Sequence, residues 1–496
     1  MPLENNNAIE NAYANFLQRY PDYASTSLLD ELRQSDYSRL EALDQVYLDY
    51  TGGSLYAESQ VRQHMQLLNT HVFGNPHSHN PTSQAMTALV ERARAFVLRY
   101  FNASPEEYTA IFTANASGAL KLVGESYPFG PGSRYVLTFD NHNSVNGIRE
   151  FARAKGAEVE YIPVVAPELR LDRQTLEAAL ERLDPARPNL FAYPAQSNFS
   201  GVQHPLAYID FARQRGWDVL LDCAAFAPTN ALDISALQPD FAVFSFYKIF
   251  GFPTGLGCLL VRKNKLARLR RPWFAGGTIT IASVQGNGHY LLDNEAAFED
   301  GTVDYLNIPA VEAGLRYVQQ VGIETIHTRV MCLAGWLLEQ LSALQHANGR
   351  RMMQIYGPQT TEQRGATITI SLLDVDGAVI DDHRVEELAN TANISLRTGC
   401  FCNPGAGEIA HELTAGEMVT FFEAGERISF QELRRRMQAN FSKSVSAVRI
   451  SLGIASNFSD VYRLVQFLRG FLDRTTAEIG IATYDRVDEF AKRDSA

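Results

Sequence analysis

Short apolar runs alternate, between residues 110 and 261, with longer segments in which apolar residues recur at helical spacing. The runs that we predict as buried strands are 110–113, 135–138, 159–164, 190–193, 219–222, 241–245 and 255–261. Between them, 144–155 and 176–183 have the spacing of amphipathic helices. This alternation is typical of a mostly parallel sheet with helices on both faces.

The pattern changes after residue 310, where apolar residues recur at helical intervals as far as Leu341, with a break near Gly322. Strands at 366–372 and 394–396 and a helix at 384–393 then indicate a smaller region, and the polar segment before Tyr47 looks helical. Because 496 residues exceed one compact core, we expect three parts. These are an N-terminal helical extension (1–45), a large α/β domain (46–320) and a small α+β C-terminal domain (321–496).

Composition narrows the class of protein. The chain is 46% hydrophobic and 20% charged, with a formal charge of -12, which argues against nucleic acid or an anionic membrane as the main partner. Residues 1–10 lack the apolar core of a secretory signal, and the most apolar stretch, 241–261, contains Lys248, Pro253 and three glycines, which excludes a membrane span. Five cysteines indicate a reducing compartment without a disulfide framework. We therefore expect a cytoplasmic protein.

Two candidate residues follow predicted strands. Lys248 comes just after the run 241–245, and its apolar neighbours would lower its pKa, as an imine-forming amine requires. A lysine that snorkels to water from a strand end is the alternative. Asp222 ends the run 219–222, at the strand end where open α/β sheets place ligands. A carboxylate there could keep a pyridine nitrogen protonated, or it could simply cap a helix.

The segment 113–119 lies between a strand and a helical run, so its amides and the Ser117 hydroxyl could bind a phosphate dianion; an ordinary serine cap is the alternative. His142 could stack on a cofactor ring. Asn198 could hydrogen-bond a ring hydroxyl, or form a turn. A lysine, an acid, a phosphate cradle and a stacking group together are what a pyridoxal 5'-phosphate (PLP) site requires.

Five motifs carry a resemblance to a known family. They are 47–49 (Tyr-Leu-Asp), 74–78 (Gly-Asn-Pro-His-Ser), 195–201 (Ala-Gln-Ser-Asn-Phe-Ser-Gly), 245–255 (around Lys248) and 397–403 (Arg-Thr-Gly-Cys-Phe-Cys-Asn). Over residues 46–471 the chain resembles the class V aminotransferase and cysteine desulfurase superfamily, and within it the N-terminal domain of molybdenum cofactor sulfurases. The resemblance implies a fold-type I PLP-dependent transferase, with a mostly parallel seven-stranded sheet in its large domain.

The resemblance also implies residue roles. PLP would be bound covalently to Lys248 and paired at its ring nitrogen with Asp222, with His142 stacked on the ring and Asn198 facing its hydroxyl. The phosphate would contact Ala116, Ser117 and Ser245. Relatives form homodimers in which the neighbouring subunit completes the phosphate site, and Thr278 is our candidate for that contribution.

Cys402 and two arginines suggest the reaction. A thiol between Gly399 and the segment 403–407 would lie on a flexible loop, able to reach a cofactor-bound substrate. Arg397 has the forked donors that suit an amino acid carboxylate, and Arg449 resembles a second arginine near the same site. In desulfurases with this pattern the cysteine takes sulfur from L-cysteine as a persulfide and leaves L-alanine, and His142 would assist as an acid or base.

Several alternatives stay open from the sequence. Cys400 and Cys402 with His411 could belong to a metal site, although we predict no metal, and the cysteines could be buried small hydrophobes. Another PLP reaction, such as aminotransfer, epimerisation or a different C–S cleavage, would not need Cys402. A catalytically silent scaffold would bind no PLP. No sulfur acceptor is indicated by the sequence.

Overall fold

The computed structural model describes residues 4–76, 78–423, 425 and 427–483. His77, in the motif 74–78, lies outside them. Within this part of the chain, no helix combines the length and the apolar character needed to cross a membrane.

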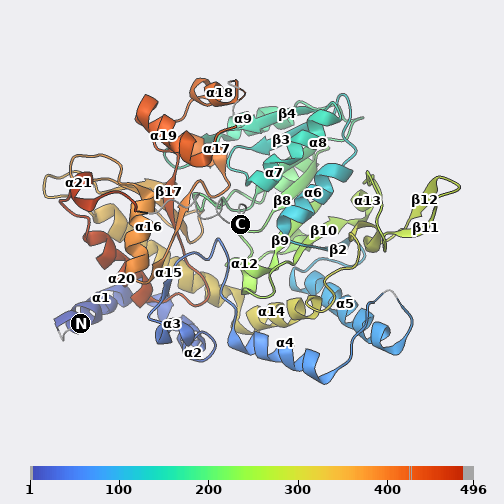
Figure 1. Ribbon diagram of the computed structural model, residues 1–496, viewed down its shortest axis with the longest axis horizontal. Coiled ribbons are helices and arrows are strands. Elements are labelled where there is room, and N and C mark those ends of the chain that lie inside the picture. Colours follow the sequence, from blue (N-terminus) through green and yellow to red (C-terminus); the bar gives the residue numbers. More distant parts are fainter. Residues whose placement is uncertain (1–3, 77, 424, 426, 484–496) are drawn as a thin grey trace.

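A seven-stranded sheet forms the centre of the larger part of the molecule, as predicted (Figure 1). Its strands, in spatial order, are β2 (Tyr108–Thr113), β10 (Gly257–Arg262), β9 (Phe241–Ser245), β8 (Asp218–Asp222), β7 (Leu190–Pro194), β3 (Arg134–Thr138) and β4 (Glu158–Ile162). β10 is antiparallel to both of its neighbours, and the other paired strands are parallel. The prediction of a mostly parallel sheet is therefore confirmed.

Helices cover both faces of this sheet. Successive strand residues enter different apolar clusters: Ala192 belongs to the cluster that contains Leu120 and Ile148, whereas Phe191 belongs to the one that contains Leu176 and Ile209. This two-sided burial explains why the central strands β7, β8 and β9 are mostly apolar rather than alternating, whereas the edge strand β4 carries two glutamates. The helices are α5 (Pro81–Tyr100), α6 (Ala116–Ser126), α7 (Asn143–Asn146), α8 (Ile148–Ala154), α9 (Arg173–Leu180), α10 (Tyr208–Arg213), α11 (Ile234–Leu237), α12 (Phe246–Phe250) and α13 (Lys263–Leu266). The helix predicted at 144–155 is two helices that meet at Gly147.

Short elements complete this part of the chain. β5 (Val164–Val165) pairs with β6 (Arg170–Leu171), and β11 (Ile279–Ser283) pairs with β12 (Gly288–Leu291) in a hairpin that projects from the body (Figure 1). The 3₁₀ helix η2 (Glu295–Phe298) follows the hairpin.

Two long helices lead to the smaller region. α14 (Ile308–Val321) and α15 (Ile323–Ala343) are separated at Gly322, whose φ of +87° favours glycine, as the sequence predicted. A four-stranded antiparallel sheet follows, in the order β13 (Met353–Tyr356), β14 (Thr367–Leu372), β17 (Ala447–Ser451), β16 (Arg397–Gly399). The helices around it are α16 (Asp382–Thr391), α17 (Pro404–Ala410), α18 (Ala415–Glu423), α19 (Phe430–Phe441), α20 (Phe458–Arg469) and α21 (Thr476–Ile479).

The N-terminal segment is helical, as expected. It comprises α1 (Glu4–Arg19), the 3₁₀ helix η1 (Pro21–Thr26), α2 (Leu28–Ser35) and α3 (Arg39–Ala42). The fully buried Arg329 of α15 donates hydrogen bonds to Thr26 and Asp30, which anchors this segment on α15. β1 (Val46–Tyr47) then pairs with β15 (Ile394–Ser395), and α4 (Glu58–Thr70) leads back to the large sheet.

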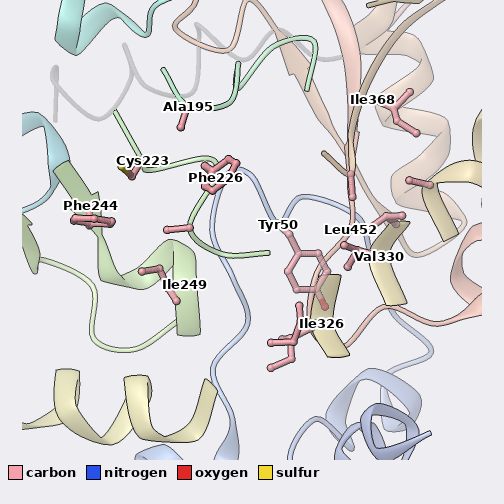
Figure 2. Packing of buried hydrophobic residues seen from close by; sticks show 14 of the residues in the cluster. Tyr50, Ala195, Cys223, Phe226, Phe244, Ile249, Ile326, Val330, Ile368 and Leu452 are labelled. Carbon is pink, nitrogen blue, oxygen red and sulfur yellow. The ribbon is translucent and has the colours of Figure 1, made fainter. Parts of the chain in front are cut away.

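One apolar core joins the large sheet to the small one. Phe244 of β9 and Ile249 of α12 belong to the same buried cluster as Ile368 of β14 and Leu452, which follows β17 (Figure 2). Tyr50 belongs to this cluster as well. The domain boundaries at residues 45 and 320 remain a prediction, because the packing is continuous across both.

Candidate active site

A cavity opens where β7, β8 and β9 end. It is lined by seven of the eight predicted cofactor residues, which are Ala116, Ser117, His142, Asn198, Asp222, Ser245 and Lys248. Parallel strands place their carboxyl ends at one edge of the sheet, which is why residues so far apart in the sequence meet here. The eighth, Thr278, is not among the lining residues.

Lys248 lies in the first turn after β9, on the short helix α12. Burial lowers the pKa of its ammonium, and the nearby Asp222 carboxylate partly opposes this shift. Asp222 is 7% exposed and accepts a hydrogen bond from the Ala224 amide (2.9 Å). The arrangement favours an amine that can become a neutral nucleophile beside a fixed anion.

The start of α6 also lines the cavity. Asn115 caps this helix by accepting from the Gly118 amide (2.9 Å), the Ala116 amide donates to Ser245 Oγ (3.0 Å), and the Ser117 and Ser144 hydroxyls are 2.5 Å apart. The positive end of the α6 dipole and the hydroxyls of Ser117, Ser144 and Ser245 together favour an anion in this part of the cavity.

His142 caps α7 with its Nδ1, which accepts from the Ser144 amide (3.1 Å). Burial lowers the pKa of the imidazole; the Asp222 carboxylate partly opposes this shift, and the Lys248 and Arg449 charges act in the same direction as burial. A ring that is neutral at neutral pH, with Nδ1 already accepting a hydrogen bond, carries its proton on Nε2.

The turn that carries Cys402 is held in place, which differs from the flexible loop that the sequence suggested. The Asn143 amide donates to Cys402 O (2.7 Å), and the Asn403 side-chain amide donates to Asp140 O (2.7 Å). The segment 404–410 is the helix α17 because Asn403 caps it, Pro404 occupies its first turn and Gly405 packs against Phe139. The expectation of a flexible segment at 403–407 was therefore wrong.

Cys402 itself is exposed. Phe401 and Cys402 both have left-handed backbones, with φ of +56° and +53°. Two consecutive non-glycine residues in this region store about 1–2 kcal/mol each, so the surrounding hydrogen bonds must hold the turn.

Asn198 connects the cavity to this turn. Its side-chain amide donates to Phe401 O (2.8 Å) and accepts from Asn403 Nδ2 (2.8 Å), and its backbone oxygen accepts from Arg449 Nη1 (3.1 Å). The predicted contact of Asn198 with a ring hydroxyl remains a prediction, and both ends of the amide already serve the cysteine turn.

Arg397 and Arg449 lie directly opposite each other on β16 and β17. Both donate to the carboxylate of Asp49: Arg397 to Oδ2 from Nε (3.0 Å) and Nη2 (2.5 Å), and Arg449 to Oδ1 (3.0 Å). The Arg449 side chain is buried and that of Arg397 is about half exposed. The structure thus brings together the two arginines that the sequence suggested for a substrate carboxylate.

The remaining candidates lie elsewhere or have other contacts. His411 is buried with its Nδ1 3.3 Å from Tyr356 Oη, and burial raises the pKa of the Cys400 thiol. Among the described residues no three His, Cys, Asp or Glu side chains group as metal ligands would. Thr278 Oγ1 donates to Ala275 O (2.8 Å) and accepts from the Ala275 amide (2.9 Å). Its role in a partner subunit remains a prediction.

The residues of the cavity fit PLP. The lining of the cavity offers the positive start of α6 with Ser117 and Ser245 for a phosphate, Lys248 for an aldehyde and Asp222 for a ring nitrogen. Gly257 leaves room for Asn115 at the start of α6, since a Cβ at position 257 would lie 2.4 Å from the Asn115 backbone carbonyl carbon.

Comparison with known proteins identifies the family. The family model "Aminotransferase class-V" matches residues 46–464, so the chain belongs to the class V aminotransferase family. It is 36% identical to a molybdenum cofactor sulfurase of Solanum lycopersicum, over 93% of this chain and 60% of that protein. It is 38% identical to the molybdenum cofactor sulfurase of Homo sapiens, over 89% of this chain and 51% of that protein. The chain thus spans about half to three fifths of the length of these relatives.

Solved structures confirm the fold. A cysteine desulfurase from Thermococcus onnurineus superposes with a TM-score of 0.73 at 23% identity, covering 89% of this chain and 98% of that one. A cysteine desulfurase from Escherichia coli gives 0.71 at 20% identity, covering 91% and 99%. The predicted fold-type I architecture is therefore confirmed.

Two residues with no predicted role belong to the site. Asp49 and Asn403 are residues of the motifs 47–49 and 397–403, to which the sequence assigns no separate role. An Asn directly before Pro404 is a sequence signal for a helix start, which could have identified the cap. No local signal connects Asp49 to the arginines, because they are 348 and 400 residues away.

Proposed function

We propose that the protein is a PLP-dependent enzyme of the cysteine desulfurase type. It converts L-cysteine to L-alanine and takes the sulfur onto Cys402 as a persulfide, which then serves molybdenum cofactor sulfuration. The observation that carries the proposal is an exposed thiol, Cys402, whose turn is hydrogen-bonded to two cavity-lining elements, through Asn143 and Asn198, while its neighbours Arg397 and Arg449 offer guanidiniums.

The residues of the cavity and the arginines Arg397 and Arg449 beside the cysteine turn have separate tasks. When bound, PLP supplies an electron sink for carbanions formed on the substrate. Lys248, with its pKa lowered by burial, takes the proton from the substrate α-carbon. Arg397 and Arg449 orient the substrate carboxylate. His142 moves a proton at the substrate thiol or the β-carbon.

The sulfur transfer is balanced without an oxidant. Cys402 Sγ, as a thiolate, forms a bond to the substrate sulfur while that sulfur's bond to the β-carbon breaks. The electron pair of the broken bond stays on carbon, which takes up a proton and leaves as the methyl group of alanine. The transferred sulfur remains on Cys402 at the sulfane level.

The test is to measure alanine and sulfide from L-cysteine with a thiol reductant. We expect Cys402→Ala to lose both products, and Cys400→Ala, which changes a partly buried thiol two residues away, to keep them. Isotopically labelled L-cysteine followed by mass spectrometry of peptides should place the label on Cys402. Full activity of Cys402→Ala would refute the role of the thiol, and an oxo-acid product instead of alanine would indicate another PLP reaction. Absence of PLP absorbance would indicate a silent scaffold.

We further propose a homodimer in a cytoplasmic setting. The hairpin β11–β12 exposes Ile281, Val284 and Tyr290, which a second subunit could bury, and it begins next to Thr278. All five cysteines are free, which suits a reducing compartment. Light scattering of the holoenzyme tests the dimer, and Val284→Asp is expected to weaken it.

A further inference from the structure

Two arginines at facing positions on neighbouring strands repel each other unless an anion lies between them. Arg397 and Arg449 are such a pair, and like charges directly opposite in an antiparallel sheet are destabilising. Burying Arg449, which is 4% exposed, adds a desolvation cost. Asp49 lies between the two guanidiniums, and each of its carboxylate oxygens accepts from a different arginine.

The position of Asp49 is itself fixed. Its backbone forms a parallel bridge with Ser451, two residues beyond Arg449, and the Thr51 amide donates to Ser451 Oγ (2.9 Å). The turn is closed by Gly52, where a Cβ would lie 2.5 Å from Asp49 Oδ2 and 2.6 Å from Arg397 Nη2. A side chain at position 52 would therefore displace the carboxylate or the guanidinium, so glycine leaves the space that this ion pair occupies.

The segment 49–56 also reaches α12, the helix that carries Lys248. The Ser54 amide donates to Tyr247 O (3.1 Å), next to Lys248, and a Cβ on Gly251 would lie 2.3 Å from the Tyr56 amide nitrogen. Residues 49–56 thus connect the guanidinium pair to the helix that carries Lys248.

We propose that Asp49 is a positioning residue that holds Arg397 and Arg449 as one unit and leaves it with a single uncompensated positive charge, suited to a substrate with one free carboxylate. Two guanidiniums and one carboxylate sum to +1, and one carboxylate of a bound amino acid brings the group to neutrality. An amino acid with a second carboxylate would leave a negative charge unpaired in a partly buried site, which is a basis for rejecting it. This inference rests on the proposed function, since it assumes that the arginines receive an amino acid.

The test uses the full-length holoenzyme and the substitutions Asp49→Asn and Asp49→Glu. With Asp49→Asn we expect the KM for L-cysteine to rise by about tenfold, the effect of losing one charge-assisted contact, with kcat within about threefold of the wild type, since Lys248 and Cys402 are untouched. Asp44→Asn is the matched control: Asp44 pairs with Arg463 on the surface (2.7 Å), and its loss should change neither constant.

A second readout separates positioning from a merely structural role. Calorimetric titration with L-alanine and L-aspartate measures binding whether or not the protein turns over L-cysteine, so it stays informative if the desulfurase proposal fails. We expect the preference for L-alanine over L-aspartate to fall by about tenfold in Asp49→Asn, because the pair then carries +2. If Asp49→Asn does not fold, Asp49→Glu, which keeps the charge but lengthens the side chain, should raise the KM and keep the preference. An unchanged KM and an unchanged preference in the variant that folds would overturn the inference.

Discussion

Replacing Asn403 by alanine is expected to release the turn that carries Cys402. The Asn403 side chain is fully buried and makes three hydrogen bonds: it donates to Asn198 Oδ1 and to Asp140 O, and it accepts from the Ala406 amide as the cap of α17. A helix cap contributes about 1 kcal/mol, and each of the two other bonds about 1 kcal/mol. The substitution therefore removes about 3 kcal/mol from the contacts that hold the turn.

This loss falls on a segment whose backbone is already unfavourable. Phe401 and Cys402 are both left-handed, so the turn opens once its hydrogen bonds no longer outweigh the strain. At about 1.4 kcal/mol per factor of ten, 3 kcal/mol makes local opening about a hundredfold more frequent. The measurements are hydrogen exchange of the amides in residues 400–410 and the rate at which Cys402 reacts with iodoacetamide.

Asn457→Ala is the matched control, because Asn457 also caps a helix, α20, by accepting from the Asp460 amide (3.0 Å). It should lower global stability without changing exchange at 400–410. The reasoning is refuted if Asn403→Ala and Asn457→Ala give the same exchange rates in this segment and the same alkylation rate of Cys402.

Three further predictions concern the supports of the site. Gly257→Ala places a Cβ against the Asn115 backbone, so it should cost about 2 kcal/mol and weaken PLP retention measured by absorbance, whereas Gly130→Ala, with open space around it, should be neutral. Burial lowers the pKa of His411 to about 4; the neutral form is thus favoured in the folded state. Stability should be full above about pH 6.5 and fall by about 3 kcal/mol as the pH drops to 4, and urea unfolding of His411→Phe should show a flatter pH profile. Arg364 is fully buried and donates to four backbone carbonyls; Arg364→Met should lower stability by about 3 kcal/mol in urea unfolding, and a midpoint equal to the wild type would contradict this.

The fold and the cofactor cavity could be predicted from the sequence because their signals are local. Asp222 and Lys248 each follow an apolar run, and parallel strands bring such ends to one edge whatever the lengths of the connections. The break between α14 and α15 was equally visible at Gly322, since only the backbone conformation of one residue decides it.

The cysteine turn and the guanidinium pair depend on contacts that no local pattern reports. Considered alone, the glycines of 403–407 suggest flexibility. In the fold, however, Gly405 packs closely against Phe139: a Cβ at position 405 would lie 2.1 Å from Phe139 O, so the position requires glycine. Asp49 meets Arg397 and Arg449 only because β1 pairs with β15 and the chain then bridges to Ser451. Such pairings are decided by the packing of the whole small sheet, so a single sequence does not specify them.

The cysteine turn and Arg449 share one support, Asn198, although they lie on different segments of the chain. Arg449 donates to the backbone oxygen of Asn198. The Asn198 side chain in turn donates to Phe401 O and accepts from Asn403 Nδ2. Arg449 also lies over the Phe401 ring, 4.8 Å from its centroid. A displacement of the guanidinium is therefore transmitted to the cysteine turn through two contacts, and residues that share partners in this way respond to substitution non-additively. Because Asn198 also lines the cavity to which Lys248 belongs, one residue connects the cavity to both the cysteine turn and Arg449.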